Sequence, residues 1–159
     1  MANGLYRGSL NELDVIDAAT VTLVKGQYIT IGEVVVAADE RIGLGFSGYD
    51  AQDSADGRIY VDLMDNSATP AAIEGKFRII MMSSQNIPIG EQPVVLDLDI
   101  TALSQGASDR RAQIAFPFTN VLLSKDKKFV FQVMNTAASA QTVSQANSTI
   151  LMDCTRQLV

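Results

Sequence analysis

The 159-residue sequence contains no histidine, no tryptophan and a single cysteine. Without histidine, one chain cannot form a Ser-His-Asp triad, a histidine-ligated zinc site or a histidine general base. Cys154 cannot form an internal disulfide, and as a nucleophile it would lack the histidine that usually activates a thiol. We therefore interpret Cys154 as a structural thiol.

Cofactor motifs and basic surface are also missing. The stretch "GLGFSG" (43–48) is rich in glycine, but it leads into a polar loop. It therefore lacks the helix N-terminus on which a dinucleotide fingerprint depends, and we expect no cofactor. The net charge of −6 and the pI near 4.5 oppose a nucleic-acid partner, because binding to phosphates requires a basic surface.

Long apolar segments are absent as well. No run approaches the roughly 20 residues that a membrane-spanning helix needs, and the start "MANGLYRGSLNELD" has no basic region followed by an apolar stretch. We expect a chain made in the cytosol, with no signal peptide and no membrane partner. With 47% hydrophobic and 19% charged residues, the composition is typical of one domain with a packed core.

The dominant period of hydrophobic residues is two, which is the period of a β-strand. It is clearest at 58–65, 93–100, 111–118 and 128–134, and shorter or more continuously apolar runs follow the same scheme. Those runs are 19–24, 27–31, 33–37, 41–46, 76–82 and 148–152. This pattern predicts an all-β fold, a single antiparallel β-sandwich of jelly-roll type with about eight to ten strands and little helix.

Alternation within these runs predicts the residues of the core. The predicted core residues are Ile59, Val61, Leu63, Phe77, Ile79, Leu96, Leu98, Ile114, Phe116, Phe129, Phe131 and Val133. Between two strongly alternating runs, "LSKDKKF" around Asp126 predicts a β-hairpin over residues 119–134. The two prolines and one glycine in 85–93 predict a connecting loop.

Two segments have little to bury. Residues 1–18 are predicted to be an N-terminal arm or a short helix before a sandwich domain of residues 19–159, because Ser9 and Glu12 form a possible capping box. Residues 135–149 are almost entirely Ala, Ser, Thr, Gln and Asn. They are expected to form either a long solvent loop or an arm or edge strand that docks on a neighbouring subunit.

Acidic residues supply the only candidate sites. The loop "GYDAQDSADG" (48–57) contains Asp50, Asp53 and Asp56, which are candidate calcium ligands. Their spacing differs from that of an EF-hand, and the flanking residues are those of a turn, so we expect a hydrated turn without metal. Asp97 and Asp99 share one strand face and could form a glycosidase dyad, but alternating acids are also typical of a solvated sheet.

Taken over the whole chain, the composition resembles that of small structural proteins of virions, such as β-sandwich decoration proteins that sit in trimers on capsids. This resemblance implies a non-enzymatic virion protein that is made in the host cytoplasm and stabilises or decorates a capsid. Its partners would be itself, as a homo-oligomer expected to be a trimer, and the capsid. The alternatives are a carbohydrate- or cell-surface-binding β-sandwich module and a carboxylate-dyad glycosidase.

Overall fold

The computed structural model describes residues 5–7, 16–36, 40–44, 56–90, 93–101, 112–117, 126–152 and 154–158. Within these ranges the chain forms twelve strands and no helix, which confirms the all-β prediction. The strands are β1 (Leu5–Arg7), β2 (Thr20–Leu23), β3 (Tyr28–Val35), β4 (Glu40–Leu44), β5 (Asp56–Asp62), β6 (Gly75–Ser83), β7 (Val94–Asp99), β8 (Ala112–Pro117), β9 (Lys127–Asn135), β10 (Gln141–Ser144), β11 (Thr149–Met152) and β12 (Cys154–Leu158). The largely polar strands β1, β10 and β12 account for the excess over the eight to ten expected.

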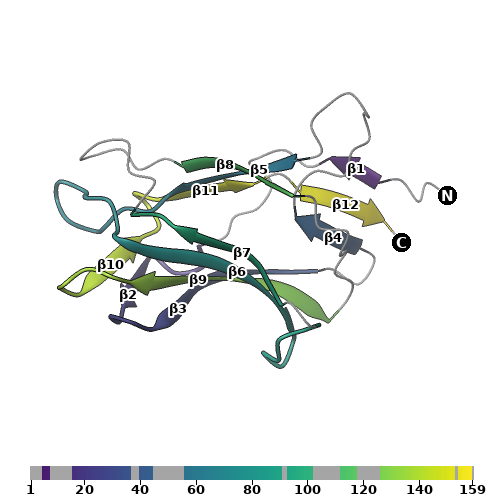
Figure 1. Ribbon diagram of the computed structural model, residues 1–159, viewed down its shortest axis with the longest axis horizontal. Helices are drawn as coiled ribbons and strands as arrows, with labels where there is room; N and C mark the ends of the chain where they lie inside the picture. The colour runs from purple at the N-terminus through teal and green to yellow at the C-terminus, as the bar shows by residue number, and fades with distance from the viewer. Residues whose placement is uncertain are drawn as a thin grey trace.

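The strands form two layers, as the antiparallel sandwich prediction requires (Figure 1). One layer is the four-stranded sheet β3-β9-β6-β7, and the opposite layer contains the sheets β11-β5-β8 and β1-β12-β4. The two-stranded sheet β10-β2 lies at one end. All strand pairs are antiparallel, and many join strands that are distant in sequence, which is the connectivity of a jelly roll.

The core lies against the inner face of the four-stranded sheet. Phe77, Phe131 and Val133 are fully buried there, and the rings of Phe77 and Phe131 lie 6.2 Å apart between centroids. Seven of the twelve predicted core residues are confirmed as buried, and two, Leu96 and Leu98, pack partly buried against the core. The side chains of the other three predicted core residues, Ile59, Ile114 and Phe116, lie outside the described part of the chain.

Strand β3 corrects the prediction of two separate strands over 27–31 and 33–37. The strand is continuous, and its pairing with β9 shifts register between Thr30 and Gly32. A glycine within a strand is typical of such a bulge, so Gly32 marks an irregularity and not a break. The outer edge of β3 is covered, because the amide of Asp17 donates to the carbonyl of Ile31 and the amide of Glu33 donates to Asp17 Oδ2, each at 3.1 Å.

The predicted hairpin over residues 119–134 is wrong. Strand β8 pairs with β5, whereas β9 pairs with β3 and β6, so the two consecutive strands lie in different sheets. Asp126 does adopt a left-handed turn conformation, with φ of 66°. Alternation shows that each strand has one buried face. It does not show whether two consecutive strands pair in one sheet or lie in opposite layers, because both arrangements give the same pattern.

The prediction of a long solvent loop over residues 135–149 is wrong, and the docking of this segment on a neighbouring subunit stays a prediction. Asn135 ends β9, and Gln141–Ser144 form β10, which pairs with β2 of the same chain. Val143 is fully buried in the core. The segment is therefore part of the fold, with residues 136–140 and 145–148 as the connections on either side of β10.

The N-terminal segment also includes residues that pair within the chain. Strand β1 pairs with β12, and Ile16 is only 5% exposed within the core. Of the helix expected over 9–19, residues 9–15 lie outside the described part of the chain, and residues 16–19 are not helical. No helix long and apolar enough to cross a membrane occurs among the residues that the structure describes.

Candidate assembly surface

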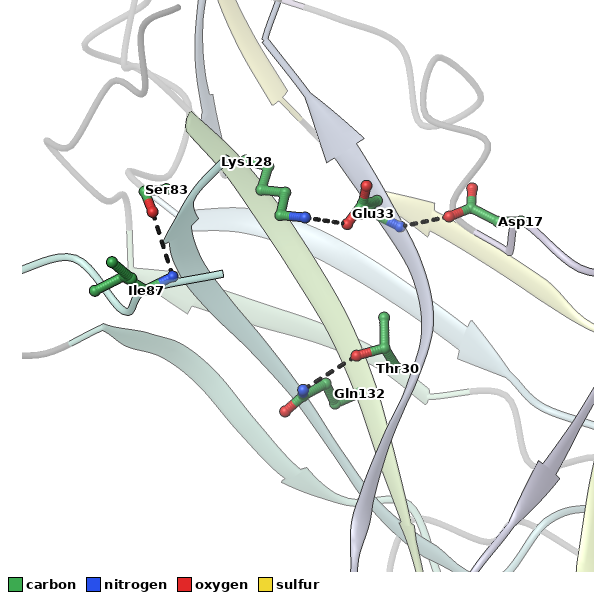
Figure 2. Close-up of polar contacts among 7 residues, drawn as sticks. All are labelled: Asp17, Thr30, Glu33, Ser83, Ile87, Lys128 and Gln132. Atoms are coloured by element: carbon green, nitrogen blue, oxygen red, sulfur yellow. Dashed lines mark hydrogen bonds and ion pairs between the residues drawn. The ribbon is translucent and has the colours of Figure 1, made fainter. Parts of the chain in front are cut away.

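The outer face of the four-stranded sheet carries a row of hydrogen-bonded polar side chains across β6, β9 and β3. Arg78 of β6 donates from Nε to Gln132 Oε1 of β9 at 2.9 Å, and Gln132 Nε2 donates to the hydroxyl of Thr30 on β3 at 3.2 Å. Figure 2 shows Gln132 and Thr30 side by side on their neighbouring strands. These bonds fix the side chains of the central strands relative to the edge strand β3.

Through Arg78 and Asp97, Tyr28 of β3 connects this polar row to β7, the strand at the other edge of the sheet. The guanidinium carbon of Arg78 lies 3.6 Å from the centroid of the Tyr28 ring, which is a cation–π contact. Burial, followed by the charge of Asp97 and a hydrogen bond with it, raises the pKa of the Tyr28 phenol. Side chains of β3 and β7 are thus connected over the two strands that lie between them.

The predicted acidic pair lies within this polar region. Asp97 and Asp99 are exposed on β7, opposite Arg78 and Lys76 of β6 respectively in the strand register. Each carboxylate therefore has a basic residue at the cross-strand position, where opposite charges stabilise a sheet. This is the arrangement of a charge-balanced sheet face.

An ion pair lies near one end of the outer face. Lys128 Nζ lies 2.6 Å from Glu33 Oε2, and the side chain of Lys128 is only 9% exposed. In Figure 2 the contacts continue from Glu33 to Asp17 on the segment that covers the edge of β3. A lysine that is buried to this extent needs a partner for its charge, so Glu33 is required on this face.

Exposed apolar residues lie near the same end of the sheet as the ion pair. Val35 and Ile87 are each 62% exposed and Val94 is 40% exposed. They lie at this end on different strands: Val35 is opposite Lys128 on the edge strand β3, Val94 is opposite Ile80 on the other edge strand β7, and Ile87 bonds through its backbone to Ser83 at the end of β6. We call Val35, Ile87 and Val94 the apolar end of the outer face.

Two buried residues lie next to this apolar end. Val130 and Ile80 are paired neighbours on β9 and β6 and are 2% and 5% exposed, although neither belongs to the main core cluster. The alternation of the sequence predicted a wetter outer face. The signal that could have revealed this surface is the failure of alternation itself, in the apolar runs 34–36 and 79–82.

The remaining predicted site residues are placed less completely. Asp50 and Asp53 lie outside the described residues, and Asp56 is the first residue of β5, opposite Pro117, so it is not in the loop where it was expected. Cys154 begins β12. Among the side chains that the structure describes, no group of three or more carboxylate or thiol residues could hold a metal ion. The absence of metal from the 48–57 loop therefore stays a prediction.

No protein-family model matches the chain, and no curated protein matches it in sequence. The fold is an all-β sandwich of jelly-roll type. It is similar to VP17, a capsid protein of bacteriophage P23-77, with a TM-score of 0.53 and 10% identity over 98% of this chain and 96% of that chain.

A second solved structure gives the same result. The chain is similar to one in the complex of VP16 and VP17, the two major capsid proteins of bacteriophage P23-77, with a TM-score of 0.54 and 11% identity. The alignment covers 98% of this chain and 99% of that chain. At such low identity the similarity shows a shared fold, and it extends over nearly the full length of both chains.

Proposed function

We propose that this protein is a non-enzymatic structural component of a virion capsid. The observation that supports the proposal is the overlap of nearly the whole chain with nearly the whole of two capsid-protein chains. The lack of histidine and the charge-balanced outer face are in keeping with a building block.

We further propose that the protein works as a homo-oligomer, expected to be a trimer, that contacts a second capsid protein. The neighbouring structure of two major capsid proteins in complex supports assembly of this kind. The apolar end of the outer face supports it independently, because exposed apolar side chains that gather on one face are typical of interaction sites. This face is then the contact between subunits.

Analysis of particles tests the capsid role. Particles purified from the source of the gene should contain the chain in many copies, as measured by quantitative mass spectrometry, and should retain it after washing at high salt. Its absence from the particles, or its removal by the wash, would contradict a structural role. Retention of the isolated protein on a glycan column would favour the carbohydrate-binding alternative instead.

Replacement of the apolar end tests the subunit contact. A variant with Val35→Ser, Ile87→Ser and Val94→Ser should lose the oligomer seen by mass photometry and still unfold cooperatively. The matched control is Val24→Ser, because Val24 is also an exposed valine (47%) but precedes the opposite end of β3. If the triple variant keeps the native mass, the contact lies elsewhere on the molecule.

A further inference from the structure

A cleft opens at the end of the sandwich away from the apolar end of the outer face. It has a volume of about 470 Å³ and lies between the β5–β6 connection (residues 65–74) and the loop that joins β9 to β10 (residues 136–140). Five of its lining residues are alanines, two are acidic, and no described lining residue is basic or aromatic.

The first wall is fixed by Asp65. Its Oδ1 accepts hydrogen bonds from the amide and hydroxyl of Ser67, at 3.1 and 2.7 Å, and from the amide of Ala71 at 2.9 Å. The bonds from Ala71 and Ser67 hold the pKa of Asp65 below its usual range. Asp65 therefore carries a negative charge at the cleft at neutral pH.

The second wall is fixed by Asn135, which is fully buried. Its Oδ1 accepts from the amide of Ala137 and its Nδ2 donates to the carbonyl of Ser139, both at 2.8 Å. The loop of small residues is thus attached at both ends to one buried side chain, so it has a defined shape although its own side chains bury little.

Gln141 connects the two walls. Its Oε1 accepts from the amide of Glu74 at 2.8 Å, and its Nε2 donates to the carbonyl of Glu74 at 2.7 Å and to Asn135 Oδ1 at 2.6 Å. The cleft is therefore preformed, and a ligand would not have to order its walls, which lowers the entropic cost of binding.

The lining limits what the cleft can hold. Two acidic residues are too few for Ca²⁺, which takes six to eight oxygen ligands. No aromatic platform is present for a sugar, and the acidic residues disfavour phosphate groups. Alanine walls allow a main chain to approach closely, and the two acidic residues of the lining, Asp65 and Glu74, give the cleft a negative charge that favours a cationic side chain.

We propose that this cleft binds an extended segment of a partner protein that carries Lys or Arg. The inference rests on the proposed function, in which the partner would be another protein of the same capsid, and it deepens that function by assigning a docking site and the chemistry of the segment. The net charge of −6 favours such a partner over an acidic one at long range.

The test uses the isolated ¹⁵N-labelled protein and two short peptides. Acetyl-Gly-Lys-Ala-Arg-Gly-amide should cause saturable shifts in the amide signals of residues 71–74 and 137–142. Acetyl-Gly-Gln-Ala-Gln-Gly-amide should bind about tenfold more weakly or not at all, and added salt should weaken the basic peptide. Equal binding of both peptides, no saturable shift, or shifts confined to other residues would overturn the proposal.

Matched variants locate the binding. Ala138→Leu fills the cleft and Glu74→Gln removes one charge, and each should weaken the basic peptide severalfold. The controls are Ala146→Leu, at an exposed alanine that does not line the cleft, and Asp126→Asn, which removes one charge at a turn that asparagine tolerates. If the controls weaken binding as much as the cleft variants, the cleft is not the site.

These outcomes are separate from those of the capsid test. Particles that contain the chain while the cleft variants bind peptide normally would leave the capsid role intact and refute the docking site. Peptide binding at the cleft by a chain that is absent from particles would support the docking site and refute the capsid role.

Discussion

The two faces of the four-stranded sheet use alternate residues of the same strands, but they are held together in different ways. On the inner face Phe77, Phe131 and Val133 are fully buried in one apolar cluster. The outer face combines a hydrogen-bonded polar row, one ion pair between Lys128 and Glu33, and exposed apolar residues at one end. The inner face thus determines whether the chain folds, and the outer face is free to determine what the folded chain contacts.

The largest effect is expected on the inner face. Phe131→Ala removes a fully buried ring that contacts Phe77 and should lower the free energy of unfolding by about 3–5 kcal/mol. Chemical denaturation with urea measures this change. An unchanged midpoint would mean that Phe131 does not face the core.

A matched pair of valines on β9 compares the two faces directly. Val133 (0% exposed) lies on the inner face and Val130 (2% exposed) on the outer face. Each substitution to alanine removes two methyl groups, worth about 1.6 kcal/mol at ~0.8 kcal/mol per group. Val133→Ala should cost more, because a closed core leaves a residual cavity. Equal costs in urea denaturation would mean that the outer face is packed as rigidly as the core.

The ion pair should give a smaller effect. Glu33→Gln leaves the buried ammonium of Lys128 without its charged partner, and the partly exposed position of Glu33 limits the loss to about 1 kcal/mol. Addition of Lys128→Met should restore part of this loss, because no buried charge then remains. A double variant that is no more stable than Glu33→Gln alone would contradict this account.

The smallest effect concerns the titration of Tyr28. Because its pKa is raised in the folded state, its contribution to stability is present below the ordinary tyrosine pKa and is lost as the pH rises through the folded value. Asp97→Asn removes a neighbouring negative charge and should lower the pKa of Tyr28 towards its ordinary value. NMR titration of ¹³C-labelled tyrosine measures the shift, and no shift would show that Asp97 does not act on Tyr28.

Sequence periodicity predicted the strands well and their partners poorly. Phe129, Phe131 and Val133 alternate clearly, so their burial could be predicted from one strand alone. The pairing of β8 with β5 could not, because partner choice depends on chain connectivity and not on alternation. The segment 135–149 was misjudged because its order comes from side-chain amides, Asn135 and Gln141, that bond to backbone groups rather than from apolar area.

The candidate surfaces, like the strand partners, depend on features that a single strand does not reveal. The exposure of Val35 depends on the bulge of β3, which shifts the register against β9, and one sequence gives no direct sign of such a shift. The cleft is formed by two connections that are distant in sequence, residues 65–74 and 136–140, and meet only after folding. The composition indicated a small-residue surface, but its acidic wall comes from another part of the chain.

The central position of β9 has a consequence for synthesis on the ribosome. Strand β3 emerges early in translation, but its only strand partner among the described residues is β9, which is made much later and also pairs with β6. Until residues 127–135 leave the exit tunnel, β3 and β6 have open edges that can pair with other nascent chains. Strong overexpression should therefore favour aggregation of incomplete chains, and slower translation should raise the soluble yield more than any stabilising substitution in the finished fold.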